Sequence, residues 1–243
     1  MNGNSHCLVA LLALSLLEPK ERDVLLPHWA CIEGGATLSD HFKIMWEPVV
    51  AGGASALVHR CYVDSNNPKD HGCITRALDH AEGSICFVED YLSGEMDDVY
   101  TEVEFLANLA MYLGILSHHI ADLCTPCHVG GKIDFRKAGF RSLKSLHRKL
   151  ERDIEKLSSV MALSMSKPVS IDFSDEYFWS IAKNTYKERF MCLSDVYSTE
   201  NEDELLKIVS QTFSEAVVHT RNTWHTVLSS TGMTSRKWSS EAI

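Results

Sequence analysis

A histidine is followed four residues later by a carboxylate at two places in this sequence. His118 and Asp122 form the first pair, and His147 and Glu151 form the second. On an α-helix, residues i and i+4 project from one face, so each pair would offer an imidazole nitrogen and a carboxylate oxygen to one pocket. This ligand chemistry, without thiolates, suits a hydrolytic zinc site that retains an exchangeable water.

A further histidine follows the first pair. Pro126 is expected to end the helix that carries Asp122, so that His128 can turn back toward the same pocket. Helical bundles build multinuclear metal sites from helices that each present a histidine and a carboxylate. A single such pair is more often a hydrogen-bonded surface couple, but two pairs with His128 favour metal. His119 lies off the ligand face, and we expect it beside the ligands or on the surface.

The segment His118-His-Ile-Ala-Asp122-Leu-Cys-Thr-Pro126-Cys-His128 resembles the zinc-dependent phospholipase C family. That family includes the catalytic domain of clostridial-type alpha-toxin and is related to the single-strand-specific zinc nucleases. The similarity continues along nearly the whole chain. It includes the family's opening histidine, its first metal aspartate, its next histidine, and the later histidine and glutamate, at His6, Asp40, His59, His147 and Glu151.

The resemblance implies three zinc ions. The ligands of the first would be Asp40, His59, His118 and Asp122. The ligands of the second would be His128, His147 and Glu151. The third would be bound by His6, by Asp122 as a bridge, and by the amino nitrogen and carbonyl oxygen of Met1, where the family has a tryptophan exposed by processing.

The function that the resemblance implies is phosphodiester hydrolysis by metal-activated water. The expected reaction is phospholipase C-type cleavage of a phospholipid to diacylglycerol and a phosphomonoester. Asp40 is the candidate catalytic residue that orients or deprotonates the nucleophile. Phe42, Tyr62 and Asp64 are the candidate substrate-binding residues. We expect a phospholipid or other phosphodiester as substrate, with peripheral membrane contact as one option.

Two alternatives stay open. In a nuclease-like phosphodiesterase, Phe42 and Tyr62 would form a base-stacking pocket. A non-catalytic helical protein would use the metal only for structure. The net charge of −10 argues against a stable nucleic-acid partner, because phosphate binding favours a basic surface, but cations at a site reverse the charge locally.

The eight cysteines are scattered, which does not indicate a disulfide-rich scaffold. We expect most of them to be reduced and buried. Cys124, Cys127 and His128 also match the Cys-x-x-Cys-His spacing of haem attachment and of redox dithiols. Inert packing of the two thiols is the favoured interpretation, because a role as metal ligand explains His128 better than haem attachment does.

Helical periodicity dominates the chain, so we predict an all-α fold: one multi-helix bundle over residues 1–243 around a multinuclear zinc site. Ser5 is expected to cap the first helix, Gly34-Gly35 to end the second, and the chain to be flexible from about residue 230. The predicted helices cover about 5–17, 20–33, 74–93, 99–124, 138–165, 174–193 and 201–229, with an irregular stretch over 40–72.

The apolar run 7–17 has two interpretations. A buried helix is favoured over a signal peptide, because no basic segment precedes the run and no small-residue cleavage site follows it. The run is too short to span a bilayer, and no transmembrane segment is predicted. If Met1 is the natural start, we expect a cytoplasmic protein; otherwise we expect a secreted one.

Overall fold

The computed structural model describes residues 3–41, 61–66, 71–96, 98–130, 140, 142–157 and 166–238, without the side chains of residues 39–41 and 143. Over these ranges the regular structure is helical, which confirms the predicted all-α bundle. The helices are α1 (Gly3–Ser15), α2 (Pro19–Leu25), α3 (Trp29–His41), α5 (Gly72–Leu92), α6 (Glu102–Cys124), α7 (Pro126–Val129), α8 (Leu143–Leu157), α9 (Asp175–Thr185), α10 (Met191–Ser198) and α11 (Glu202–Ser230). Short 3-10 turns cover Leu26–His28 and Met233–Ser235, and a π-helical turn over Tyr186–Phe190 joins α9 to α10.

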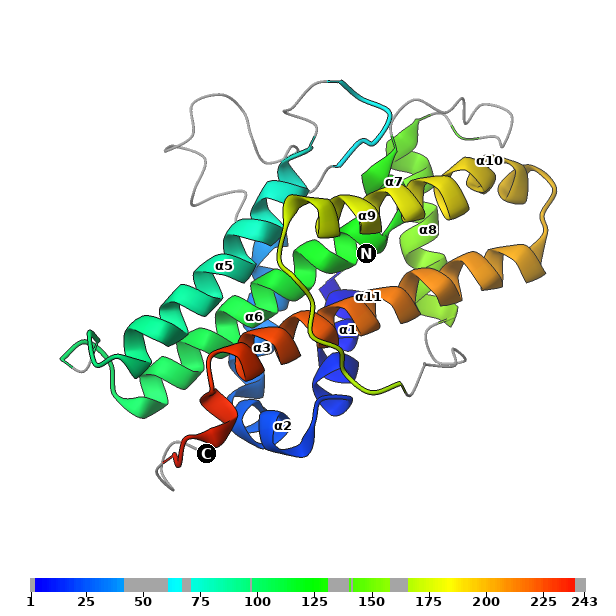
Figure 1. Ribbon diagram of the computed structural model, residues 1–243. Coiled ribbons are helices and arrows are strands. Elements are labelled where there is room, and N and C mark those ends of the chain that lie inside the picture. Colours follow the sequence, from blue (N-terminus) through cyan, green and yellow to red (C-terminus); the bar gives the residue numbers. More distant parts are fainter. Residues whose placement is uncertain are drawn as a thin grey trace.

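Helix α6 is the central element of the bundle, and α1, α3, α5, α9 and α11 pack around it (Figure 1). The helix begins with a capping box in which Thr101 and Glu104 satisfy each other's backbone N–H groups. From Leu116 to Cys124 every side chain is buried, including the polar ones. A helix that is buried on all sides must satisfy its polar side chains inside the protein, and this places the candidate ligands of α6 in the interior.

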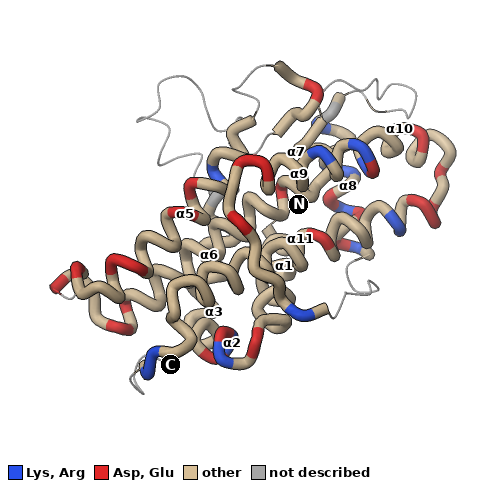
Figure 2. The backbone as a smooth tube through the Cα atoms, in the orientation of Figure 1, with Lys and Arg blue, Asp and Glu red and all other residues tan. Residues whose placement is uncertain are grey.

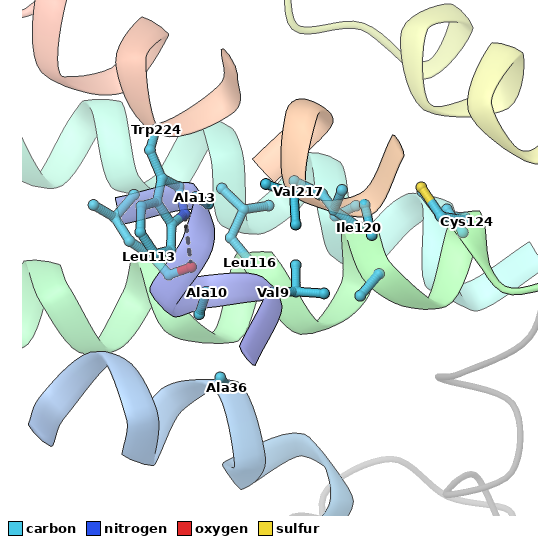
Figure 3. Close-up of a cluster of buried hydrophobic side chains, with 14 of the residues drawn as sticks. Val9, Ala10, Ala13, Ala36, Leu113, Leu116, Ile120, Cys124, Val217 and Trp224 are labelled. Atoms are coloured by element: carbon cyan, nitrogen blue, oxygen red, sulfur yellow. Dashed lines mark hydrogen bonds between the residues drawn. The ribbon is translucent and has the colours of Figure 1, made fainter. Parts of the chain in front are cut away.

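The core around α6 joins the two ends of the chain. Val9 and Ala13 of α1 and Val217 of α11 lie against Leu116 and its neighbours on α6 (Figure 3). Trp224 of α11, which is fully buried, donates a hydrogen bond from its indole nitrogen to the Leu113 carbonyl at 3.0 Å. Helix α1 is therefore a core element, as the favoured interpretation of the apolar run 7–17 requires.

Helix α3 does not end at Gly34-Gly35 but continues through both glycines to His41, so that prediction is wrong. The reason is a close crossing with α6. A Cβ atom on Gly35 would collide with the Met111 carbonyl oxygen and lie 2.9 Å from the Ile115 nitrogen, and Gly114 faces Gly35 in the same way. The lost helix propensity of glycine is offset by this backbone-to-backbone packing.

Three other boundaries differ from the prediction. Ser5 is buried within α1 and does not cap it, because that helix already includes Gly3. The helix predicted over 174–193 continues to Ser198 because the π-helical turn inserts without breaking it. The helix predicted over 138–165 is described over 143–157, and residues 158–165 lie outside the described part of the chain.

The described part of the C-terminal segment is packed against the bundle. Met233 is fully buried, and the Trp238 ring lies 5.9 Å from that of Phe105 and nearly parallel to it. The Arg236 guanidinium lies 4.9 Å from the centre of the Trp238 ring. The expected flexibility from about residue 230 stays a prediction, and within residues 231–238 the contacts of Met233 and Trp238 hold the chain against the bundle.

Among the described residues, no helix combines the length and the apolar character that a membrane span requires.

The close crossing of α3 and α6 at Gly35 can be tested by substitution, with the preceding residue, Gly34, as a matched control. Gly35→Ala is expected to lower the free energy of unfolding by about 3 kcal/mol, because its methyl group meets backbone atoms that cannot move independently. Gly34→Ala meets nothing within 4 Å and is expected to raise it by about 1 kcal/mol. Urea denaturation measures both. Equal effects of the two substitutions would contradict the close crossing.

Candidate metal centre

His118 and Asp122 lie on one face of α6, as their spacing predicts. The His118 Nε2 atom is 3.4 Å from an oxygen of Asp122, and each side chain is only 1 % exposed. The other ring nitrogen of His118, Nδ1, donates a hydrogen bond to the Ala36 carbonyl at 2.8 Å, since a carbonyl oxygen can only accept. This bond assigns the proton of a neutral ring to Nδ1 and leaves Nε2 as the lone-pair donor that a metal needs.

His6 reaches the same carboxylate from α1. Its Nε2 lies 3.6 Å from Asp122 Oδ1, and its ring stacks on His118 with centroids 3.8 Å apart. Neither ring nitrogen of His6 makes a hydrogen bond within the described part of the chain. Burial, and then the neighbouring His118, hold the pKa of His6 well below its usual value, so the ring is neutral and in its ligand form.

These three side chains form a cluster that could hold a metal ion. Each of His6, His118 and Asp122 offers a ligand atom, and the three atoms lie within 4.8 Å of one another. All three side chains are buried.

A second group of side chains continues from this cluster. His128 of α7 places its Nε2 3.6 Å from Asp122 Oδ1, the oxygen that His6 also approaches. His147 of α8 lies 2.8 Å from His128, nitrogen to nitrogen, and 3.5 Å from the Glu151 carboxylate. Asp122 therefore joins the inner cluster to the outer group.

The two groups differ in depth. The side chains of His6, His118 and Asp122 are 1 % exposed, whereas that of His128 is 11 % exposed. The exposed fraction then rises to 29 % for His147 and 21 % for Glu151. The centre therefore opens to solvent at α8.

The turn after α6 positions His128. Thr125 leaves the helical conformation, its hydroxyl donates to the Ala121 carbonyl at 2.8 Å, and Pro126 starts α7. The segment 61–63 then runs beside α7, because the Cys61 and Val63 N–H groups donate to the His128 and Val129 carbonyls at 2.8 Å.

That pairing places two of the predicted substrate-binding residues next to the centre. Tyr62 lies within this segment and Asp64 directly follows it, and both are half-buried. Their role in binding substrate stays a prediction.

Several predicted site residues lie outside the described part of the chain. Met1, Phe42 and His59 are in this group. Asp40 belongs to the last turn of α3, four residues after Ala36, but its side chain is not described. The structure therefore brings together the side chains of His6, His118, Asp122, His128, His147 and Glu151, and the proposed roles of these and of the remaining residues stay predictions.

Of the two positions expected for His119, the structure shows the one beside the candidate ligands, with its ring centroid 5.8 Å from that of His118. His119 is 2 % exposed and stacks on His80 of α5 with ring centroids 5.4 Å apart. Its carbonyl oxygen accepts a hydrogen bond from the Cys73 thiol at 3.4 Å. Helix α5 covers the side of α6 that carries His119, and the spacing of residues along one helix does not show which neighbouring helix covers it.

Two histidines expected to be structural have protein partners. His225 lies 2.6 Å from the buried carboxylate of Glu21, and His219 bonds to the Tyr177 hydroxyl at 2.9 Å. The thiols of Cys124 and Cys127 are buried, and burial raises the pKa of both, which suppresses the reactive thiolate. Their environment agrees with inert packing.

The Ala36 carbonyl and the Gly35–Gly114 crossing are parts of the centre that were not predicted. The small residues Gly34-Gly35-Ala36 and the glycine in the middle of α6 were the available signal. Glycines inside helices indicate a close approach of two backbones, and this approach carries the Ala36 carbonyl to His118.

Comparison with models of known protein families finds no match for this chain, and comparison with curated proteins finds none either.

Zinc binding can be tested at the shared carboxylate. Asp122→Asn keeps the size of the side chain and removes its charge, so we expect zinc retained after dialysis to fall by roughly tenfold or more. Glu21→Gln is the matched control, because Glu21 is also a buried carboxylate beside a histidine but lies outside the centre. Elemental analysis measures the zinc. Equal zinc in Asp122→Asn and the wild type would show that this carboxylate is not a ligand.

Proposed function

We propose that the protein is a zinc-dependent phosphodiester hydrolase that cleaves a phospholipid in the manner of a phospholipase C. The observation that carries the proposal is the convergence of three histidines on the single carboxylate of Asp122. A further histidine and carboxylate, His147 and Glu151, lie at the solvent-exposed side of the centre, which we call its mouth. Nitrogen and oxygen ligands in this arrangement fit divalent zinc. A centre that uses zinc only for structure is usually closed by protein ligands, whereas this one is partly exposed at His147 and Glu151.

Bound zinc would supply a Lewis acid for a phosphoryl oxygen and would lower the pKa of a water molecule toward neutrality. The chain contributes the positions of the groups around it. The Ala36 carbonyl fixes the proton of His118 on Nδ1, so that Nε2 faces the centre. Asp122 supplies negative charge at the bottom of the centre, where water is largely excluded.

Substrate would enter at the outer group. His147 and Glu151 are the most exposed members of the centre, so a phosphodiester approaching from solvent meets them first. Asp40 is proposed to orient or deprotonate the nucleophile, and Tyr62 and Asp64 to contact the substrate from the segment beside α7. The glutamate at position 151 and the Thr-Pro-x-His sequence over 125–128 favour the phospholipase branch of the resemblance over the nuclease branch.

Hydrolysis of bis(p-nitrophenyl) phosphate tests the reaction class. We expect zinc-loaded protein to hydrolyse it, a chelator to abolish the activity, and His147→Gln to lower kcat/KM by about 100-fold, because a ligand at the mouth is lost. His225→Gln is the control, because this histidine pairs with Glu21 outside the centre. Protein that retains zinc but hydrolyses nothing would support the non-catalytic alternative.

A second assay separates the substrate classes. We expect the zinc-loaded protein to release phosphomonoester from a phosphatidylcholine emulsion faster than it cleaves single-stranded DNA at equal phosphodiester concentration. Faster cleavage of DNA would favour the nuclease-like alternative and contradict the phospholipase assignment.

A further inference from the structure

Helix α8 carries a second chemical feature beside its two metal-centre residues. Lys144, Arg148 and Arg152 are spaced four residues apart and are all exposed. We refer to these three residues as the α8 basic stripe. Successive residues of a helix are turned by about 100° and rise by about 1.5 Å, so the stripe is about 12 Å long. It occupies the helix face next to the one that presents His147 and Glu151.

The stripe lies at the rim of the mouth. The centre becomes more exposed from α6 outward to α8, and the opening is at His147 and Glu151. Arg148 directly follows His147 in sequence, and Arg152 directly follows Glu151. A ligand that approaches these two mouth residues from solvent therefore passes close to the cations of the stripe.

None of the three stripe cations forms an ion pair with a carboxylate of the described chain, whereas Lys149 on another face of α8 is bonded to Asp153 at 2.7 Å. The nearest acidic residue on the stripe side of the helix is the exposed Glu155, one turn after Arg152. The Arg152 Nε donates a hydrogen bond only to the Arg148 carbonyl, at 3.1 Å. The whole chain carries a net charge of −10, and Figure 2 shows acidic residues gathered where α5 and α6 meet, with others on α8 itself and at the start of α11. A row of cations at the mouth of the centre is thus a local exception in an acidic protein.

We infer that the α8 basic stripe docks the protein on an anionic phospholipid surface, with the mouth of the metal centre facing the head groups. The inference rests on the proposed function, because that function explains why phosphodiesters would reach the exposed side of the metal centre. The partner follows from the chemistry of the stripe. Residues 143–157 contain no Phe, Tyr or Trp, whereas single-stranded nucleic-acid sites interleave basic residues with aromatic stacking platforms. A lipid surface attracts basic side chains by charge alone.

The test compares two triple substitutions that remove the same charge. The first variant carries Lys144→Gln, Arg148→Gln and Arg152→Gln. The control variant carries Lys20→Gln, Arg76→Gln and Lys167→Gln, which are exposed basic positions on other elements. Zinc-loaded protein is sedimented with phosphatidylcholine vesicles, with and without phosphatidylserine, after brief incubation in the cold. Each basic residue near an anionic surface contributes about fivefold to partitioning, so the stripe variant should bind the phosphatidylserine vesicles about 100-fold less tightly.

The control variant and the wild type are expected to bind equally, to prefer vesicles with phosphatidylserine, and to bind less tightly as salt is raised. Equal loss of binding in both triple variants would overturn the inference, because it would show an effect of total charge. Tighter binding of the stripe to single-stranded DNA than to vesicles would also overturn it. Stripe-dependent vesicle binding without hydrolysis of bis(p-nitrophenyl) phosphate would support the docking and contradict the proposed function, so the two can fail separately.

Discussion

The carboxylate of Asp122 is the group on which the arrangement of the centre depends. A carboxylate with 1 % exposure carries a large desolvation cost unless charged or polar groups surround it. Three imidazoles on three helices lie within 3.6 Å of it, with His6 on α1, His118 on α6 and His128 on α7. Burial keeps the His6 ring neutral, so histidines alone compensate the charge incompletely. A divalent cation is the partner whose charge fits this combination of a buried anion and neutral rings.

The packing of the scaffold and the orientation of the ligands depend on the same contact. Gly35 and Gly114 allow α3 and α6 to approach until their backbones touch, and the next residue, Ala36, then meets the His118 ring with its carbonyl. A larger residue at either glycine would separate the helices and move that carbonyl away from the ring. The helix crossing therefore contributes to stability and also sets the tautomer of His118.

The spacing of residues along single helices predicted which side chains of the centre share a helix face. The pairs His118–Asp122 and His147–Glu151 share a helix face because i,i+4 geometry is independent of the rest of the chain. The all-α class followed from periodicity for the same reason.

The errors arose where tertiary contacts outweigh local preference. Glycine usually ends a helix, but Gly35 is retained inside α3 by its contact with α6. Tertiary contacts also add features that local patterns do not show. Helix α5 covers the side of α6 that carries His119, and Met233 and Trp238 of the C-terminal segment pack on the bundle. Spacing within a helix also could not show that His6 lies against His118, because 112 residues separate them (118 minus 6).

That separation has a consequence for biosynthesis. The inner cluster needs α1 to find α6 after more than a hundred residues have been made, and the outer group cannot form before α8 has left the ribosome. A nascent chain that stops short of α8 would hold Asp122 with all three of its histidine neighbours but would lack His147 and Glu151 of the outer group. The growing chain therefore reaches a complete centre only after α8 emerges, and α11, which packs on both α1 and α8, is added last.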